Sequence, residues 1–443
     1  MVLCLLSPAT GEGADSATTL SLSNCIEMAL NNATTAKKAK NTLKLQGADV
    51  MRSYGSFLPQ VSVSAGYTPY RLSRSYNVLY TPPPLTKTTL RSADLTLTTS
   101  LNLFNGFRDY STLQSALQRE HAAEFTLTRA LESVVFDVTQ AYFQVLLDGE
   151  LLDISRENLR SVQDQLTLTE RQFQVGLKSM TDRYQQQAEV EESRLSAIKA
   201  ETRMQRSMFE LMRRLHIDPQ TTIVLVPDPQ EMKIPSDAKQ NIDALVAQAM
   251  ERRGDLKSKL LETKAAEWQL KASRGSWYPS IDVNFNITSG GTEYLNGEYA
   301  YPPLSEQLGK TIGYSAGVRL NWLLFDGFQT RYAVQSSKIT MLNQQLDYDD
   351  LHRNIELDLH QAAGDYASAF TQIETAKVSF TAATSAYNAV KRKYELGAAS
   401  FVELSAARAT QFNAKSNLSQ ARYNLALQKN VLDFATGNIK ISQ

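Results

Sequence analysis

The chain has 443 residues, and its 46 basic and 46 acidic side chains leave no net charge. This balance gives no reason to expect a nucleic-acid or other polyanionic partner. With only two cysteines and four histidines, in no spacing that suits a disulfide framework or a metal site, we expect no resident metal or cofactor.

Residues 1–19 contain a short apolar run followed by small residues, as at the end of a secretory signal peptide. The basic segment that precedes such a run is missing, so we expect the natural start to lie further upstream. Cys4 is a poor lipidation candidate because Met1 stands where a lipoprotein signal carries leucine. No later segment approaches the roughly 18 apolar residues of a spanning helix, so a membrane passage would have to use strands.

The first repeat, 20–216, opens with a predicted helix over 20–52, where apolar residues recur every three or four positions. Gly55 and Pro59 end this helix, because the residue before a proline is disfavoured in the helical region. Two strands follow, predicted at about 61–68 and 94–104 from the alternation of apolar and polar residues. Each strand therefore has one apolar face and one face rich in serine, threonine and asparagine.

A long helical hairpin is predicted after the second strand, over about 105–213. From 108 to 174 there is no proline, and the apolar spacing of a helix continues. About 65 helical residues would span nearly 100 Å at about 1.5 Å each. The helix is expected to end at Gly176, near the position after a helix that glycine favours, and a second helix then runs back.

A linker is predicted over 217–241 because it carries Pro219, Pro227, Pro229 and Pro235. The second repeat, 242–437, follows the plan of the first, and 438–443 form a tail. Its predicted elements are strands at about 281–288 and 312–325 and a helical hairpin over about 326–436, whose first helix ends at Gly397.

Short motifs support this duplication. LFNGF begins at residue 103 and LFDGF at residue 324, a separation of 324 − 103 = 221. Two further pairs keep the same order at offsets of 220 and 221: GSFLPQV (55–61) with GSWYPSI (275–281), and RQFQVGLKSMTD (171–182) with RKYELGAASFVE (392–403). A series of matches at constant spacing indicates a tandem duplication.

The LFNGF and LFDGF motifs lie where a strand gives way to a helix. Their asparagine or aspartate is predicted to cap the helix by accepting hydrogen bonds from its first amides. Their glycine permits the bend and close backbone approach. The predicted junction residues are Pro59, Asn105, Gly106, Pro279, Asp326 and Gly327.

The alternating strands have two explanations. In a soluble protein the apolar face would cover a core, whereas in a membrane barrel it would face lipid and the polar face a wet lumen. Aromatic residues gather at both ends of the strands, as in interfacial girdles: Phe57, Phe104, Trp277, Tyr278, Trp322 and Phe325 near the helices, and Tyr70, Tyr294, Tyr299 and Tyr301 near the loops. Four strands are too few to close a barrel, so copies of the chain would have to share one.

This order of elements, with both junction motifs and both hairpin turns, resembles the TolC-like outer-membrane efflux protein family over about 20–437. The resemblance implies a mixed α and β membrane protein, a homotrimer whose twelve-stranded β-barrel in the outer membrane continues as a periplasmic α-helical barrel. It implies no enzymatic activity. The trimer would be the exit duct of a tripartite efflux or type I secretion system, with a periplasmic adaptor and an inner-membrane pump of the resistance-nodulation-division or ABC type docking at its tip.

The resemblance also assigns a gate to the hairpin turns. The predicted gate residues are Thr181, Asp182, Tyr394 and Glu403, beside the turn glycines Gly176 and Gly397. The first two match the family's Thr-Asp pair, the third its latch tyrosine and the fourth its first pore carboxylate. Ala399 and Ala406 stand where the best-known member has a latch arginine and a second constricting aspartate, so that member's gate is not expected here. The alternative is that Asp182, Tyr394 and Glu403 are all solvated turn residues.

Two other functions fit the sequence less well. No phosphate-binding glycine loop, nucleophile elbow or zinc-binding histidine pair supports an enzyme, and His352 and His360 are merely eight apart on a predicted helix. A soluble periplasmic coiled-coil adaptor or scaffold without a pore would explain the hairpins, but not four strands with lipid-type alternation. Drugs, metals, solvents and polypeptides all stay open as substrates, because these systems share one architecture.

Overall fold

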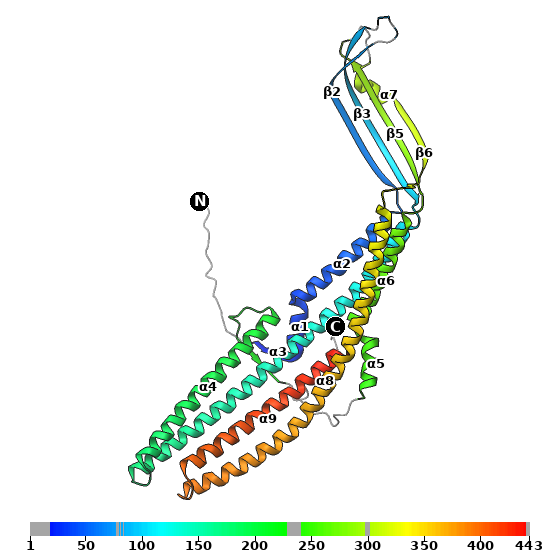
Figure 1. Cartoon of the computed structure of the whole chain (residues 1–443). Helices are drawn as coiled ribbons and strands as arrows, with labels where there is room; N and C mark the ends of the chain where they lie inside the picture. Colours follow the sequence, from blue (N-terminus) through cyan, green and yellow to red (C-terminus); the bar gives the residue numbers. More distant parts are fainter. Residues whose placement is uncertain are drawn as a thin grey trace, which may run out of the picture. The chain divides into compact units, whose positions relative to one another are not determined.

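The computed structural model describes residues 18–76, 79, 81–82, 84–227, 241–296 and 302–439. Residues 1–17 of the expected signal-peptide remnant, together with Pro229, Pro235, Tyr299, Tyr301 and most of the C-terminal tail, lie outside this part. The chain divides into two compact units. The sheet unit holds Thr42–Glu124 and Ser258–Tyr348, and the helical unit holds the other residues (Figure 1).

A four-stranded antiparallel sheet in the order β2-β3-β5-β6 forms the core of the sheet unit (Figure 1). Its strands are β2 (Gln60–Tyr76), β3 (Leu85–Phe104), β5 (Ser280–Tyr294) and β6 (Ile312–Asn321). Across the sheet, Val63 lies opposite Leu97, Leu97 opposite Ile287, and Ile287 opposite Tyr314. Since side chains alternate along a strand, the predicted apolar residues at the paired positions of the four strands share one face.

The strand lengths differ from those predicted. β2, β3 and β5 are longer than the predicted ranges 61–68, 94–104 and 281–288. Their backbone pairing continues past the residues where the alternation of apolar and polar side chains fades, and the prediction depended on that alternation. β6 is shorter than the predicted 312–325: its last pair joins Asn321 to Ser280, and Pro279, which directly precedes β5, has no N–H to donate. Trp322 instead donates its indole N–H to the carbonyl oxygen of Trp277 at 3.2 Å.

A short helix that the sequence did not predict, α7 (Leu304–Lys310), covers part of the edge of β5. β6 pairs with β5 only as far as Ser289. Beyond that point the side-chain amide of Gln307 accepts from the N–H of Thr292 at 3.0 Å and donates to its carbonyl oxygen at 3.2 Å. This amide satisfies backbone groups that a longer β6 would otherwise bind.

Each repeat begins with two helices where a single one is predicted. The breaks lie at Ala33 and Arg253, whose ψ angles of 126° and 120° leave the helical region. Because 253 − 33 = 220, the break is a feature of the repeat. The four helices are α1 (Leu22–Asn32), α2 (Thr34–Gly55), α5 (Ile242–Arg252) and α6 (Gly254–Gly275).

The larger parts of two long hairpins, without the first turns of α3 and α8, belong to the helical unit (Figure 1). They are α3 (Arg108–Gln174) with α4 (Met180–Leu215), and α8 (Gln329–Glu395) with α9 (Phe401–Ala435). Tyr142, Leu211 and Leu215 are fully buried in its main core. The segment predicted as a linker contributes β4 (Ile223–Leu225), which pairs in parallel with β1 (Thr18–Leu20). None of the described helices is both long and apolar enough to cross a membrane.

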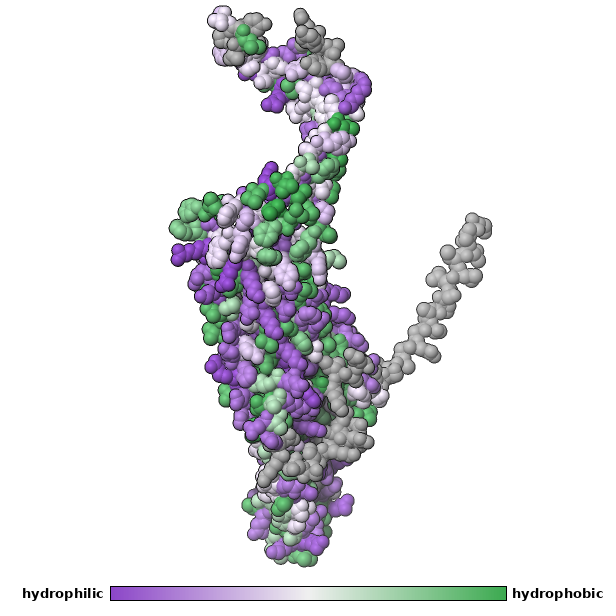
Figure 2. All heavy atoms as spheres, turned by 90° about the vertical axis from the view of Figure 1, so that its right-hand side faces the viewer, coloured by the Kyte–Doolittle hydropathy of each residue, from purple (hydrophilic) through white to green (hydrophobic). Residues whose placement is uncertain are grey.

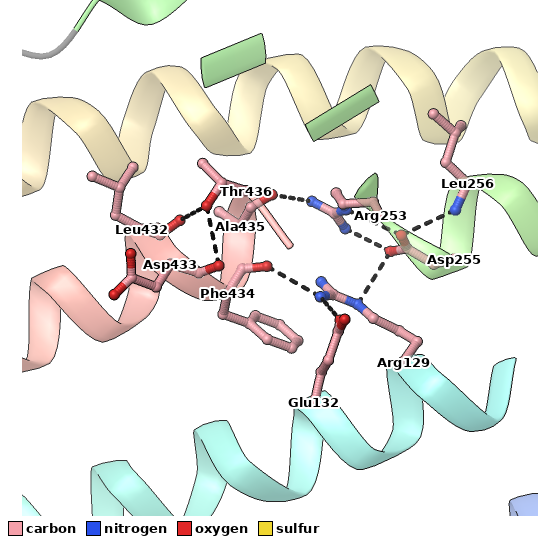
Figure 3. A network of polar contacts seen from close by, with 10 residues as sticks. All are labelled: Arg129, Glu132, Arg253, Asp255, Leu256, Leu432, Asp433, Phe434, Ala435 and Thr436. Carbon is pink, nitrogen blue, oxygen red and sulfur yellow. Dashed lines mark hydrogen bonds and ion pairs between the residues drawn. The ribbon is translucent and has the colours of Figure 1, made fainter. Parts of the chain in front are cut away.

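A network of polar contacts holds the end of α9 in the helical unit (Figure 3). Arg253 donates to both carboxylate oxygens of Asp255, at 3.1 and 2.6 Å, and to the carbonyl of Ala435 at 3.3 Å. Arg129 donates to the carbonyl of Phe434 at 3.1 Å. Burial raises the pKa of Asp255, but the hydrogen bond and charge of Arg253 outweigh it and keep that pKa below its usual range. Two arginines thus satisfy carbonyls that the helix end leaves free.

Apolar surface, green in Figure 2, gathers in the sheet unit where strands give way to helices. The exposed large apolar residues there include Trp277, Tyr278, Trp322, Leu323, Leu324, Phe325 and Phe328. Several of them belong to the girdle predicted near the helices. An exposed patch of this kind marks a surface that meets lipid or another protein.

Candidate functional site at the hairpin turns

The two hairpin turns have the same backbone. Gly176 and Gly397 have φ angles of 79° and 76°, in the left-handed region that glycine tolerates best. After each helix the N–H of the residue following the glycine donates five residues back, from Leu177 to the Gln172 carbonyl and from Ala398 to the Lys393 carbonyl, both at 2.8 Å. This is the Schellman arrangement that closes a helix C-terminus, so both repeats end their first long helix in the same way.

The predicted gate carboxylates both belong to capping boxes. Asp182 accepts from the backbone N–H of Ser179 at 3.0 Å and from its hydroxyl at 2.8 Å, and Glu403 accepts from the N–H of Ser400 at 2.9 Å. Each serine hydroxyl accepts in return from the N–H of its acidic partner, at 3.1 and 3.3 Å. The hydrogen bonds from Ser179 lower the pKa of Asp182. Each box uses one carboxylate oxygen and fixes the first turn of α4 or α9.

The other two gate candidates differ in exposure. Thr181 is exposed in the first turn of α4. Tyr394 is only 2% exposed and packs beside Tyr387 and Leu404. The ammonium group of Lys178 lies 3.8 Å from the centre of the Tyr394 ring, a cation–π contact that joins the two turns within one chain. Among the described residues, no group hydrogen-bonds the buried Tyr394 hydroxyl.

A partly buried ion pair that the sequence analysis missed lies a short way along the helices from the turns. Arg408 of α9 donates to Glu189 of α4 at 3.0 Å, and the Ser405 hydroxyl donates to the same carboxylate oxygen at 3.2 Å. Arg408 is 4% exposed. The other oxygen of Glu189 and the Nε of Arg408 are buried without a hydrogen-bond partner in the described chain. A signal was present: Arg408 follows the buried Leu404 by four positions and so occupies the same helix face.

The predicted residues lie at the strand–helix junctions, but Asn105 and Asp326 do not occupy the N-cap position predicted for them. α3 and α8 begin three residues after Asn105 and Asp326, which therefore precede the N-cap position predicted for them. Their side chains still accept from helix amides, those of Asp109 at 3.3 Å and Thr330 at 2.7 Å. The phenylalanines of each motif pack edge to face, with ring centres 5.4 and 5.6 Å apart. Pro59 and Pro279 directly precede β2 and β5.

Comparison with known proteins identifies the family. The family model described as "Outer membrane efflux protein" matches residues 25–215 and 245–438. The chain therefore belongs to this family, whose members are channel proteins of the outer membrane and not enzymes.

Three similar proteins can be compared with the chain. CyaE of Bordetella pertussis is 24% identical over 332 residues, which cover 75% of this chain and 66% of that protein. Outer membrane protein TolC of Escherichia coli is 21% identical over 389 residues, 86% of this chain and 75% of TolC. The outer-membrane channel OprN has a solved structure that matches with a TM-score of 0.81 at 18% identity, covering 94% of this chain and 90% of OprN.

These similarities confirm the predicted fold class. The structural neighbours are trimeric channels of the TolC family, and this chain combines long helices with a sheet as predicted. The chain is thus an outer-membrane efflux or secretion channel that extends into the periplasm.

Proposed function

We propose that the trimer is the exit duct of a tripartite system, which receives substrates from an inner-membrane pump and a periplasmic adaptor. Support comes from the family and from the long hairpins that each repeat supplies. The pump would be of the resistance-nodulation-division or ABC type. Isolation of the cross-linked complex from intact cells, followed by mass spectrometry of the inner-membrane component, distinguishes these two types.

We further propose that the gate lies at the hairpin turns and that contacts within one chain hold it shut. The observation that carries this proposal is the joining of both hairpins by Glu189 with Arg408 and by Lys178 with Tyr394. A buried ion pair with unsatisfied atoms gains less than a fully hydrogen-bonded one. Its stabilisation is therefore small enough for a partner protein to overcome when it draws the hairpins apart.

Glu403 is the best candidate for ion selectivity at this gate. It is exposed beside the second turn, and its capping box uses one carboxylate oxygen. In a trimer three such carboxylates would surround the threefold axis and favour cations, with an effect that weakens as salt rises.

Single-channel recording in planar bilayers tests both parts of the gate proposal. Glu189→Gln keeps the size of the side chain and removes the charge opposite Arg408, so we expect a higher resting conductance. Glu403→Gln is expected to reduce cation selectivity. Glu191→Gln is the matched control, because Glu191 is an exposed residue of the same helix and its one ion pair within the described residues is with nearby Arg194 at 2.9 Å. If conductance and selectivity are unchanged in the first two variants, the packing of the helix ends closes the channel, and these charged residues do not.

A further inference from the structure

A β-bulge in β2 changes which of its residues share the apolar face of the sheet. Tyr67 lies opposite Ala93, whereas beyond the bulge Arg74 lies opposite Lys87. The register shift falls between Thr68 and Arg71. Because one extra residue reverses the alternation, even-numbered residues of β2 beyond the bulge join the face that carries Tyr67, and odd-numbered residues turn to the polar face.

The bulge therefore places two cations directly opposite each other on the apolar face. Arg74 and Lys87 are both exposed, and neither side chain forms an ion pair within the described chain. Like charges at directly paired positions destabilise a sheet. The neighbouring cation on this face, Arg91, differs because Glu293 binds it at 2.6 Å. Within the part of the chain that the structure describes, this pair of cations is not neutralised, so it is suited to an anion from outside the chain.

The position of this pair along the barrel suggests which anion. A strand residue advances about 3.3 Å, or about 2.5 Å along the membrane normal at a tilt of about 40°. An apolar band about 25 Å tall then takes about ten residues of β2, from the start of the strand to Tyr70. Arg74 lies about 10 Å beyond that band, towards the end of β2 that is farther along the strand from α2, where the headgroups of the outer leaflet lie.

We propose that Arg74 and Lys87 bind a phosphate group of an outer-leaflet lipid headgroup, a site that rests on the barrel orientation of the proposed function. Arginine and lysine are the usual partners of phosphate oxygens. The next pair on the same face is Tyr76 with Leu85, 67% and 51% exposed. Their apolar surface lies where it can contact the rest of the bound lipid. The trimer would carry three such sites.

Binding of bisphosphorylated lipid A to the purified trimer in non-ionic detergent tests this site. Neutralising one basic residue near a membrane surface weakens binding about five-fold, so Arg74→Gln with Lys87→Gln should weaken it about 30-fold. The matched control is Arg71→Gln, which removes an exposed cation three residues away on the polar face and should change binding less than about two-fold. Fully dephosphorylated lipid A should bind the unmodified trimer and the double variant equally.

Three results would overturn the proposal. Equal loss in Arg71→Gln and the double variant would indicate general attraction of charge. Displacement of lipid A by millimolar inorganic phosphate would indicate a site for free anions. A less heat-resistant double-variant trimer in lipid-free detergent would show that Arg74 and Lys87 contact a neighbouring subunit. Single-channel conductance of the double variant should equal that of the unmodified trimer, so failure of the lipid site is distinguishable from failure of the duct function.

Discussion

The two strand–helix junctions share a five-residue motif but have different surroundings. A Cβ added to Gly106 would lie 2.2 Å from the Gly275 carbonyl oxygen, whereas one added to Gly327 would meet nothing within 4 Å. β3 stays paired up to Phe104, but β6 ends at Asn321, before its motif begins. The first junction is therefore enclosed within the chain and the second is open.

The duplication explains this difference. The first junction is enclosed by β5 and α6, which belong to the second repeat. By the same geometry, the second junction should be enclosed by β2 and α2 of the next copy in the trimer. Gly55, the counterpart of Gly275 (275 − 55 = 220), also has open space around it. We therefore expect Gly55 of one copy to lie against Gly327 of another, and the residues after Asn321 to pair with β2 of that copy.

The largest expected effect is that of Gly106→Ala. This residue has a φ of 69°, and its new Cβ would overlap the Gly275 carbonyl, so we expect a loss of about 3–5 kcal/mol from strain and collision together. The recovery of heat-resistant trimers from outer membranes measures the loss. Gly149→Ala is the control: this glycine lies within α3 in open space, and alanine there should stabilise by about 0.5–1 kcal/mol.

Gly327→Ala tests the open junction directly. In an isolated chain it would cost only the strain of a φ of 64°, about 1–2 kcal/mol. If Gly55 of the next copy lies against it, the loss should approach that of Gly106→Ala and should affect trimer assembly more than helix content. Circular dichroism and cross-linking of the same sample separate these two effects. Normal trimers at normal yield would contradict the expected contact.

The register in which β6 of one copy pairs with β2 of the next gives a more specific test of the comparison between the two junctions. Leu97 lies opposite Ile287 within the chain, and the repeat offsets convert this pair to Val318 (97 + 221) and Tyr67 (287 − 220). Direct partners are close enough for a disulfide, so Val318→Cys with Tyr67→Cys should give covalent trimers on oxidation. Leu320→Cys with Tyr67→Cys, on the same face but out of register, is the control. Preferential cross-linking of the control pair would refute the predicted register.

A smaller effect is expected at the hairpin turns, which are closed within the chain in both repeats. Loss of a capping hydroxyl costs about 1 kcal/mol, so Ser179→Ala and Ser400→Ala should fray the starts of α4 and α9 to similar extents. Hydrogen exchange of the first-turn amides measures this fraying. Trimer yield should not change, and a large loss of trimers would show that the turns also depend on another copy.

The smallest effect is expected at low pH, on the stability of the first turn of α4. Hydrogen bonds from Ser179 lower the pKa of Asp182. A lowered carboxyl pKa contributes stability above the unfolded-state pKa, and this stability is lost as pH falls through the folded value. We therefore expect amide exchange at the start of α4 to accelerate below about pH 4 relative to the exchange expected from chemistry alone. Asp182→Asn should remove this acid dependence.

Much of the fold could be predicted because it depends on local chemistry. Alternation of apolar and polar residues predicted the apolar face of the sheet, and proline-free helical spacing predicted the hairpins. Gly176 and Gly397 mark the turns because left-handed backbone favours glycine. The serine and acidic residues of both capping boxes were visible three positions apart, although their roles in the boxes were not recognised.

The sequence by itself determined the duplication, the types of element and the family. Only the tertiary structure decided which elements meet: the pairing of Glu189 with Arg408, the breaks at Ala33 and Arg253, and the bulge that places Arg74 beside Lys87. Local preferences act over a few neighbouring residues, whereas an ion pair or a strand register depends on groups far apart in the chain. The partner of the end of β6 is still harder to predict from the sequence, because it is expected to belong to another copy of the chain.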